Sequence, residues 1–248
     1  MSWFERIFRA RGNGSQPAGE QRSAPGSLPP GAPQTRINPI DGAEMVLIPE
    51  GDFLMGDDKH TETLEAFYIY KNLVTVGQYG KFCEETGYRM PEAPGFNWNW
   101  YLKDHPIVNV CWDDAMEYCR WAGVALPTEA QWEKAARGTD GRRYPWGDDW
   151  DPTKCANSAH LDEAGPGTTV AVGRYTDSPY GLSDMAGNVW QWCADDTDGT
   201  GKCRVLKGAS SFNIDEAGFR AAYRAWTEHG WKDANDGFRC VARAAILS

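Results

Sequence analysis

Hydrophobic residues recur at helical spacing in three separate stretches of the chain. The first spans residues 75–86 and ends before Gly87, a common helix stop. The second is expected to start at a cap formed by Asp113 or Asp114. The third opens with Thr128-Glu-Ala-Gln, a capping box that satisfies free backbone N–H groups at a helix start. The buried faces of these helices are expected to comprise Val76, Tyr79, Phe82 and Cys83, then Ala115, Cys119 and Ala122, then Trp132, Ala135 and Ala136.

Short apolar runs predict β-strands in the first third of the chain, at 45–49, 51–56 and 67–70. The second half is rich in Gly, Pro, Asp and Asn, and little of it is periodic. Brief strands are expected there only at stretches such as 169–173 and 204–207. The pattern predicts about three helices, short strands and long loops.

The N-terminal region differs from the rest of the chain. Residues 12–36 are mostly Gly, Pro, Ser, Ala and Gln. Such residues bury too little apolar surface to offset the conformational entropy that the chain loses when it becomes ordered, so this stretch predicts a flexible linker. Residues 1–11 predict a short basic amphipathic segment that contacts an anionic membrane surface or a partner, or else a frayed terminus. This segment has Trp3, Phe4, Ile7 and Phe8 at helical spacing, with Arg6, Arg9 and Arg11 between them. The globular domain is expected at 37–248.

Composition narrows the classes of function. The net charge of -10 argues against nucleic-acid binding, which requires a basic face. No apolar run approaches the ~20 residues that a membrane-spanning helix needs. The chain opens without the continuous apolar stretch of a secretory signal, so we expect a cytoplasmic protein, with any membrane association made through residues 3–11.

Five Trp- and Gly-rich phrases occur in order along the C-terminal half of the chain. Over about residues 37 to 243, the sequence resembles the formylglycine-generating enzyme (sulfatase-modifying factor) family. That resemblance implies an α+β fold of the C-type-lectin-like type. The phrases are Leu126-Pro-Thr-Glu-Ala-Gln-Trp-Glu, Tyr144-Pro-Trp-Gly-Asp, Tyr180-Gly-Leu-Ser-Asp-Met-Ala-Gly-Asn-Val-Trp-Gln-Trp, Arg204-Val-Leu-Lys-Gly-Ala-Ser and Gly237-Phe-Arg-Cys.

The same resemblance implies oxidation of a substrate cysteine by copper(I) held between two thiolates, which are the soft ligands that copper(I) prefers. The two positions fall on Asn213 and near Gly218, and neither residue is a thiol. Cys203, the nearest upstream cysteine, is expected to point elsewhere. A second branch of the superfamily uses iron held by three histidines from a signature that is missing here. We therefore expect neither copper nor iron, and we interpret the four histidines, His60, His105, His160 and His229, as unrelated.

The seven cysteines contain no CxxC pair, so the sequence indicates neither a zinc site nor a thioredoxin-like motif. The resemblance implies that Cys119 and Cys240 lie close together, and related enzymes can join these positions by a disulfide. The alternative is that both are reduced, buried hydrophobic side chains in a cytosolic protein.

Calcium is the one metal that the resemblance makes plausible, as a structural ion. The expected oxygen ligands are Asp184, the carbonyls of Gly187 and Val189, and Gln191, where relatives usually have Glu. Loss of that carboxylate should weaken the site. The alternative is loops closed by Asn and Asp hydrogen bonds without metal. A second set would combine Asn157 and the Ser158 carbonyl with Asp162 or Glu163.

Residues 211–236 mix aromatic and small polar side chains, a composition typical of binding loops. The variable proteins of diversity-generating retroelements, which share the fold, concentrate their substitutions in a similar C-terminal region. For Tyr223 and Trp226 the alternative is a role as core aromatics that support loops. The candidate ligand-binding residues are Ser211, Phe212, Asn213, Asp215, Tyr223, Trp226, Thr227, His229, Trp231, Asp233, Asn235 and Asp236.

The missing thiols and this surface favour a non-catalytic protein that binds a protein or other macromolecule through residues 211–236, such as the target protein of a diversity-generating retroelement. The alternative is a divergent metal-dependent oxidase. It would require Cys193, Cys203 or several histidines to converge beneath Asn213.

Overall fold

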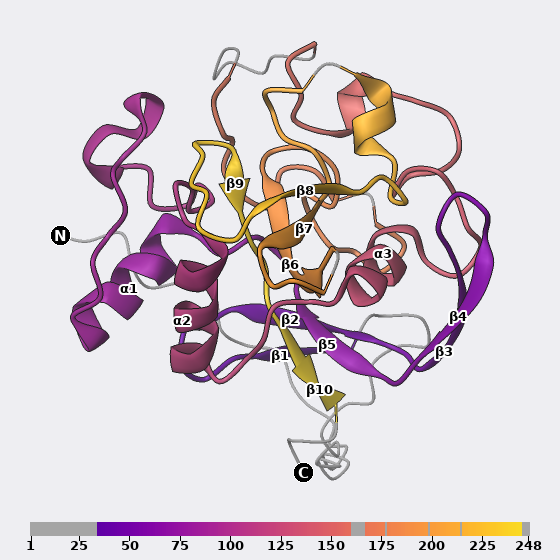
Figure 1. Ribbon diagram of the computed structural model, residues 1–248, viewed down its shortest axis with the longest axis horizontal. Coiled ribbons are helices and arrows are strands. Elements are labelled where there is room, and N and C mark those ends of the chain that lie inside the picture. The colour runs from indigo at the N-terminus through magenta and orange to yellow at the C-terminus, as the bar shows by residue number, and fades with distance from the viewer. Residues whose placement is uncertain (1–33, 160–166, 177, 198, 214, 245–248) are drawn as a thin grey trace, which may run out of the picture. The chain divides into compact units, whose positions relative to one another are not determined.

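A computed structural model describes residues 34–159, 167–176, 178–197, 199–213 and 215–244 (Figure 1). The amphipathic segment expected at 1–11 and nearly all of the linker expected at 12–36 lie outside the described residues. The first strand, β1 (Thr35–Ile37), starts two residues before the expected domain boundary. Within the described ranges, no helix combines the length and apolar character needed to cross a membrane.

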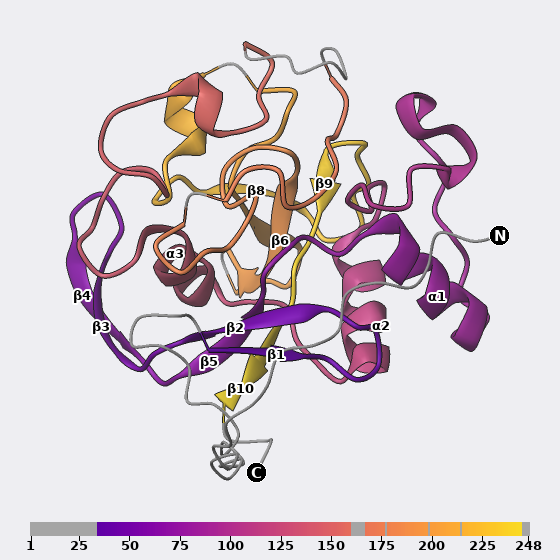
Figure 2. The same ribbon diagram turned by 180° about the vertical axis from the view of Figure 1, so that it is seen from behind.

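The first sheet joins the two ends of the described chain. Its strands are all antiparallel and run in the order β1-β2-β5-β10 (Figure 2). Ile69 in the central strand β5 lies opposite Val46 on one side and Val241 on the other, and all three are buried. Beyond β1, the strands of this sheet are β2 (Glu44–Ile48), β5 (Phe67–Tyr70) and β10 (Val241–Arg243).

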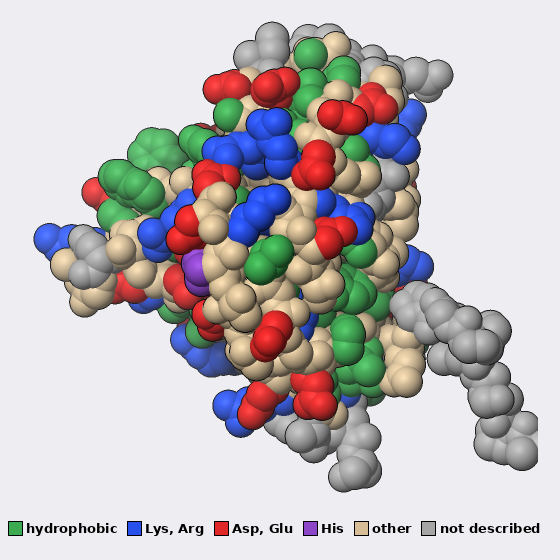
Figure 3. All heavy atoms as spheres, turned by 90° about the vertical axis from the view of Figure 1, so that its right-hand side faces the viewer, with side chains coloured by type: hydrophobic (Ala, Val, Ile, Leu, Met, Phe, Trp, Pro, Cys, Tyr) green, Lys and Arg blue, Asp and Glu red, His purple; other side chains and the backbone are tan. Residues whose placement is uncertain are grey.

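A hairpin formed by β3 (Gly51–Met55) and β4 (His60–Leu64) projects to one side, next to α3 (Figure 1). Its turn, residues 56–59, contains Asp57, Asp58 and Lys59. On the face of the molecule that includes this side, Lys and Arg side chains gather in a broad band with acidic side chains among them (Figure 3).

A second four-stranded sheet has the order β8-β7-β6-β9. Its pairs are antiparallel except for β6 and β9, which run parallel, so the chain leaves β7 and returns to the far side of β6 after β8. The candidate ligand-binding segment lies almost wholly in this excursion. The strands are β6 (Trp190–Asp196), β7 (Cys203–Lys207), β8 (Ala225–Glu228) and β9 (Asp236–Gly237).

The three predicted helices are confirmed: α1 (Val76–Thr86), α2 (Trp112–Ala122) and α3 (Glu129–Arg137). Thr128 caps α3 in the expected capping box with Gln131. The expectation that Asp113 or Asp114 begins α2 is wrong. Its N-cap is Cys111, and Asp114, at the third helical position, reaches back to accept the Cys111 N–H at 2.9 Å.

The helices cover the sheets with the faces expected from their spacing. Tyr79 of α1 and Tyr118 of α2 stack at 5.8 Å, and both meet Phe238 edge-on. Trp132 of α3 packs in a cluster with Val205 of β7 and Ile69 of β5. This cluster couples the two sheets, and burying side chains of this size supplies much of the hydrophobic free energy of folding.

Two predictions about the second half have different outcomes. The strand expected at 204–207 is present as β7. The strand expected at 169–173 is wrong, because this stretch has no strand partner. Instead, the Val170 N–H donates to the Asn188 side-chain oxygen and the Val170 carbonyl accepts from the Asn188 amide, both at 3.1 Å. These two bonds replace the backbone hydrogen bonds that a neighbouring strand would supply. Short 3-10 helices occur in the loops, namely η1 (Gly95–Trp100), η2 (Pro152–Lys154) and η3 (Glu216–Phe219).

Candidate functional site

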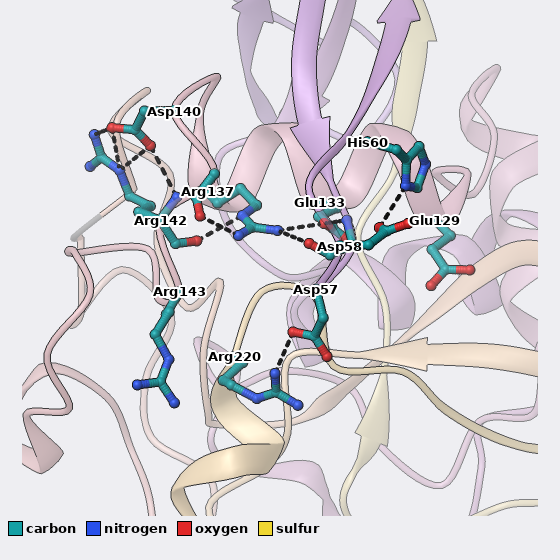
Figure 4. A network of polar contacts seen from close by, with 12 residues as sticks. Asp57, Asp58, His60, Glu129, Glu133, Arg137, Asp140, Arg142, Arg143 and Arg220 are labelled. Carbon is teal, nitrogen blue, oxygen red and sulfur yellow. Dashed lines mark hydrogen bonds and ion pairs between the residues drawn. The ribbon is translucent and has the colours of Figure 1, made fainter.

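The Lys207-Gly-Ala-Ser phrase at the end of β7 is fixed to α3 by buried charges. The Lys207 ammonium is fully buried and lies 3.1 Å from the Glu133 carboxylate and 3.4 Å from that of Glu129. Glu133 also pairs with buried Arg137 at 2.8 Å (Figure 4). Removing one partner of such a network would leave an uncompensated buried charge, which costs a large free energy. The network therefore holds the end of β7 against α3 and fixes the start of the loop that follows.

That loop is closed by Asn213, the residue at the first position where the resemblance places a copper thiolate. Its side-chain oxygen accepts from the Ser210 N–H at 2.9 Å and the Ser210 hydroxyl at 2.8 Å. Its carbonyl accepts from the Ser158 N–H and hydroxyl at 3.0 and 2.8 Å. The second position, Gly218, is buried, and a Cβ there would contact Ala209 at 3.8 Å. Both positions therefore serve loop closure and packing.

The thiols that the oxidase alternative invokes lie in separate places. Cys193 is fully buried in the cluster around Trp132, where burial raises its pKa well above the ordinary value. Cys203 is half-buried at the start of β7. Cys155 was not expected near the loop, yet it packs in a cluster with Ala209 and Phe219. The sulfurs of Cys119 and Cys240 are both buried and lie 3.7 Å apart, within hydrogen-bond distance, and no disulfide joins them in the structure.

Three of the four histidines are described, and they have different partners. His60 pairs with Asp58 at 2.8 Å, His105 contacts the Thr169 hydroxyl at 2.9 Å, and His229 pairs with Asp113 at 2.8 Å. His160 lies outside the described residues. Among the residues with described positions, no three His, Cys, Asp or Glu side chains are grouped as a metal site would require.

The residues expected to hold the first calcium ion already form hydrogen bonds with one another and with neighbouring side chains. Gln191 accepts N–H groups from Trp132 at 2.8 Å and Arg239 at 2.7 Å, and its own amide donates to the Asp184 carbonyl at 2.8 Å. The Gly187 carbonyl accepts the Val189 N–H. Because a guanidinium cation already occupies the Gln191 oxygen, this set does not fit a calcium ion.

Asp184 itself has an incomplete set of partners. One carboxylate oxygen accepts the Gly173 N–H at 3.0 Å, and the other is buried without a partner in the described structure. Burial raises the pKa of Asp184 to about 6, while the Gly173 N–H and Arg239 favour its charged form.

The second expected calcium set is only partly described. The Asn157 amide donates to the carbonyls of Pro152 and Cys155, and its oxygen accepts the Ala159 N–H at 2.9 Å. Ser158 bonds to Asn213 as described above. The carboxylates expected to complete the set, at 162 and 163, lie outside the described residues.

The candidate ligand-binding residues do not form one uniform surface. Phe212, Trp226 and Trp231 are 42%, 65% and 54% exposed. Ser211 and Asp236 are buried. Burial, assisted by Asp233, raises the pKa of Asp236 to about 7. The remaining candidates are exposed at Asp215 and His229 and half-buried at Asn213, Tyr223, Thr227, Asp233 and Asn235.

Contacts divide the exposed aromatic side chains into two groups. Phe212 lies 6.5 Å from Phe96 of η1. Trp226 is on β8 and Trp231 is in the turn after it, where its N–H bonds to the Glu228 carbonyl. Tyr223 lies 6.1 Å from Trp190 and braces the segment from within. The segment therefore presents aromatic groups at its start and on β8.

Sequence reasoning missed two neighbouring features. The first is the stretch 95–101, where Trp98 and Tyr101 are 69% and 56% exposed. Its run of aromatic and Asn residues is the signal from which it could have been found. The second is a cavity lined by Arg143 and Arg220, which no local pattern indicates because its residues come from three distant segments.

Comparison with solved structures shows the fold. PvdO from Pseudomonas aeruginosa matches 88% of this chain and 100% of its own, with a TM-score of 0.73 and 22% identity. Treponema denticola variable protein 1 matches 87% of this chain and 100% of its own, with a TM-score of 0.66 and 19% identity. The prediction of an α+β, C-type-lectin-like fold with about three helices is confirmed.

Sequence relatives include proteins named for the activity and a protein named as inactive. Formylglycine-generating enzyme of Streptomyces coelicolor is 30% identical over 91% of this chain and 98% of its own. Inactive C-alpha-formylglycine-generating enzyme 2 of Bos taurus is 34% identical over 65% of this chain and 58% of its own. Residues 31–244 match the family described as the sulfatase-modifying factor enzyme 1-like domain. The chain belongs to this family.

Proposed function

We propose that this chain is a non-catalytic member of its family that binds a protein or other macromolecule through residues 211–236. The observation that carries the proposal is the closure of the loop at Asn213. Four hydrogen bonds from Ser210 and Ser158 engage its oxygens where a pair of thiolates would have to face a metal ion. An amide and a glycine supply no soft ligand for copper(I).

The exposed aromatic residues support a role in binding. Large rings that stay in water cost free energy, and a ligand that covers them recovers it. Trp226 and Trp231 are both more than half exposed and lie on an edge strand and its turn. Their neighbours Thr227, Glu228 and His229 supply hydrogen-bonding groups around them. Aromatic anchors ringed by polar groups are typical of protein-binding surfaces.

The relatives are compatible with this proposal. The family includes a bovine protein named as inactive, so its fold persists without the activity that names the family. The fold is also that of a Treponema denticola variable protein. A reverse transcriptase gene and a near-copy of the coding segment for 211–236 beside this gene would identify the chain as the target of a diversity-generating retroelement.

The alternative is a divergent metal-dependent oxidase. It is favoured by the near full-length match to a formylglycine-generating enzyme and by one thiol, Cys155, in the cluster with Ala209 and Phe219. Copper(I) would need a second soft ligand beside it. In the described part of the chain, the remaining six cysteines include one close pair, Cys119 and Cys240, in a different cluster.

An anaerobic copper(I) titration against a competing chelator separates the two functions. We expect the wild-type protein to lose copper to the chelator. The double variant Asn213→Cys, Gly218→Cys should retain one equivalent, because it restores two thiolates at matched positions. Asn213→Ser, Gly218→Ala is the control for loop disruption. Stoichiometric copper on the wild-type protein, together with aldehyde formation on a cysteine-containing sulfatase peptide, would overturn the proposal.

A further inference from the structure

A cavity of about 360 Å³ opens between the β3–β4 turn, the loop after α3 and the candidate ligand-binding segment. Three segments far apart in the sequence contribute charged side chains to it. Its charged lining consists of Lys59 and Asp57 from the turn, Arg137, Arg143 and Asp148 from α3 and its loop, and Arg220 from the segment. Four cations and two carboxylates give it a positive excess in a chain whose net charge is -10.

Hydrogen bonds to its backbone hold Arg143 in place, while its guanidinium has no carboxylate partner among the described residues. Its N–H donates to the Asp148 carboxylate at 2.9 Å, and its carbonyl accepts the Ala221 N–H at 2.8 Å. These bonds tie the loop to the candidate segment. No dashed line reaches the Arg143 side chain in Figure 4, and within the described residues it has no carboxylate partner. Its neighbour Arg142, by contrast, pairs with Asp140 at 2.7 Å.

Arg220 already binds one carboxylate in this cavity. It forms an ion pair with Asp57, whose side chain is 66% exposed, and its Nε donates to the Ala217 carbonyl at 3.3 Å. The second terminal nitrogen of Arg220 has no bond to the described residues. A guanidinium has five N–H donors, so Arg220 can hold Asp57 and a second oxyanion together.

Arg137 forms the buried base of the cavity, and four of its five N–H donors have partners there. Its donors go to Glu133 at 2.8 Å and to the carbonyls of Gly56, Gly141 and Arg142. It fixes the β3–β4 turn to the loop after α3 and leaves ligand binding to the three other cations. Lys59, exposed on the turn, has no carboxylate partner in the described ranges.

We propose that this cavity binds an oxyanion, a carboxylate or a phosphate group, between Arg143, Lys59 and Arg220. The inference deepens the proposed function and rests on it, since Arg220 belongs to the segment assigned to the ligand. Two guanidinium groups offer paired N–H donors that match the oxygens of either group, and an ammonium adds a point charge. The oxyanion comes either from acidic side chains of a macromolecular ligand or from a small phosphorylated molecule.

NMR titrations of the full chain test this site with three probes: inorganic phosphate, a hexaglutamate peptide and a hexaglutamine peptide. We expect saturable shifts in the amides around Arg143 and Arg220. Arg143→Gln should weaken binding by about 5- to 10-fold, as expected for loss of charge-assisted hydrogen bonds. Arg142→Gln is the matched control, because it removes the same charge from the same loop and should change affinity by less than about twofold.

The outcomes distinguish binding at this site from non-specific attraction to positive charge. They also distinguish failure of the site from failure of the proposed function. Equal weakening by both Arg variants, or no saturable binding of phosphate or hexaglutamate, would overturn the site. Hexaglutamate binding above hexaglutamine supports an acidic macromolecule, and binding of phosphate alone supports a small oxyanion ligand. If the wild-type protein held copper and still bound phosphate at Arg143, the proposed function would fail and the site would stand.

Discussion

Gln191 and Arg239 bond side chain to side chain in the centre of the molecule, with 2.7 Å between the Arg239 Nε and the Gln191 amide oxygen. Both residues are fully buried. The remaining Arg239 donors go to backbone carbonyls, including those of Ser183 and Asp184 at 2.7 and 3.1 Å. Burial lowers the pKa of Arg239 to about 10, which leaves it charged at neutral pH. An internal guanidinium thus organises carbonyls around a phrase where a calcium ion was expected.

This arrangement predicts that the substitution Gln191→Glu makes the thermal stability of the protein depend on calcium. The substitution replaces the N–H that donates to the Asp184 carbonyl by a carboxylate oxygen, and two oxygens then face each other. A cation between them would relieve the repulsion. We expect the melting temperature of the variant to rise with calcium and fall with EDTA, whereas the wild-type melting temperature changes little. A large calcium response in the wild-type protein would restore the original expectation.

Asp236 makes the stability of the protein depend on pH. Its pKa in the folded protein is about 7, above the ordinary value of 3.8, because it is buried near Asp233. Between these values the folded state binds more protons than the unfolded state, so this residue makes stability fall as the pH rises from 3.8 to about 7.

Asp236→Asn should therefore raise the free energy of unfolding at pH 8 by on the order of 3 kcal/mol and change it little at pH 4. Denaturant unfolding at the two pH values measures the difference. Asp149→Asn, at an exposed position, is the control and should show no such trend. A uniform effect of Asp236→Asn at both pH values would contradict the assigned pKa.

Gly187 is required by close packing of two loops. It has a φ of 78°, and a Cβ there would lie 2.2 Å from the Ala156 carbonyl oxygen. Gly187→Ala is expected to lower the free energy of unfolding by more than about 3 kcal/mol, since backbone must move. Gly80→Ala, inside α1 with open space around it, should instead stabilise the protein by about 0.5–1 kcal/mol. Chemical denaturation of both variants compares the two effects.

The exposed tryptophans should contribute little to folding. Trp226→Ala and Trp231→Ala are expected to change the free energy of unfolding by less than about 0.5 kcal/mol, because both side chains remain largely in water. Trp192→Ala removes a fully buried ring and should cost about 3–5 kcal/mol. Thermal unfolding distinguishes the classes. A large loss of stability for Trp226→Ala would assign it to the core and count against the proposal that it binds a ligand.

The helices were predictable from sequence because their signals are local. Thr75 and Thr128 cap helices whose apolar spacing fits the buried faces seen in the fold. The cap of α2 was misassigned because a carboxylate at the third helical position can reach back as well as an N-cap residue can reach forward. The choice between them depends on backbone geometry one residue upstream.

The candidate site was only partly predictable. The positions of Asn213 and Gly218 follow from aligned phrases, and the aromatic content of 211–236 is visible in the sequence. The burial of Asp236 and the cavity at Arg143 depend on pairings between distant segments. Apolar periodicity carries no information about such pairings, because it reports which face of one element is buried and not which distant segment packs against it.

The excursion from β7 to β9 is pinned at both ends by residues whose charges have no contact with water. Lys207 is locked into α3 at one end, and Arg239 is locked into the carbonyls around Ser183 at the other. These two anchors hold the ends of the excursion without help from the side chains that it exposes to water, such as Trp226. Outward-facing side chains such as Trp226 can therefore be exchanged, through evolution or by design, without rebuilding the buried contacts that fix the fold.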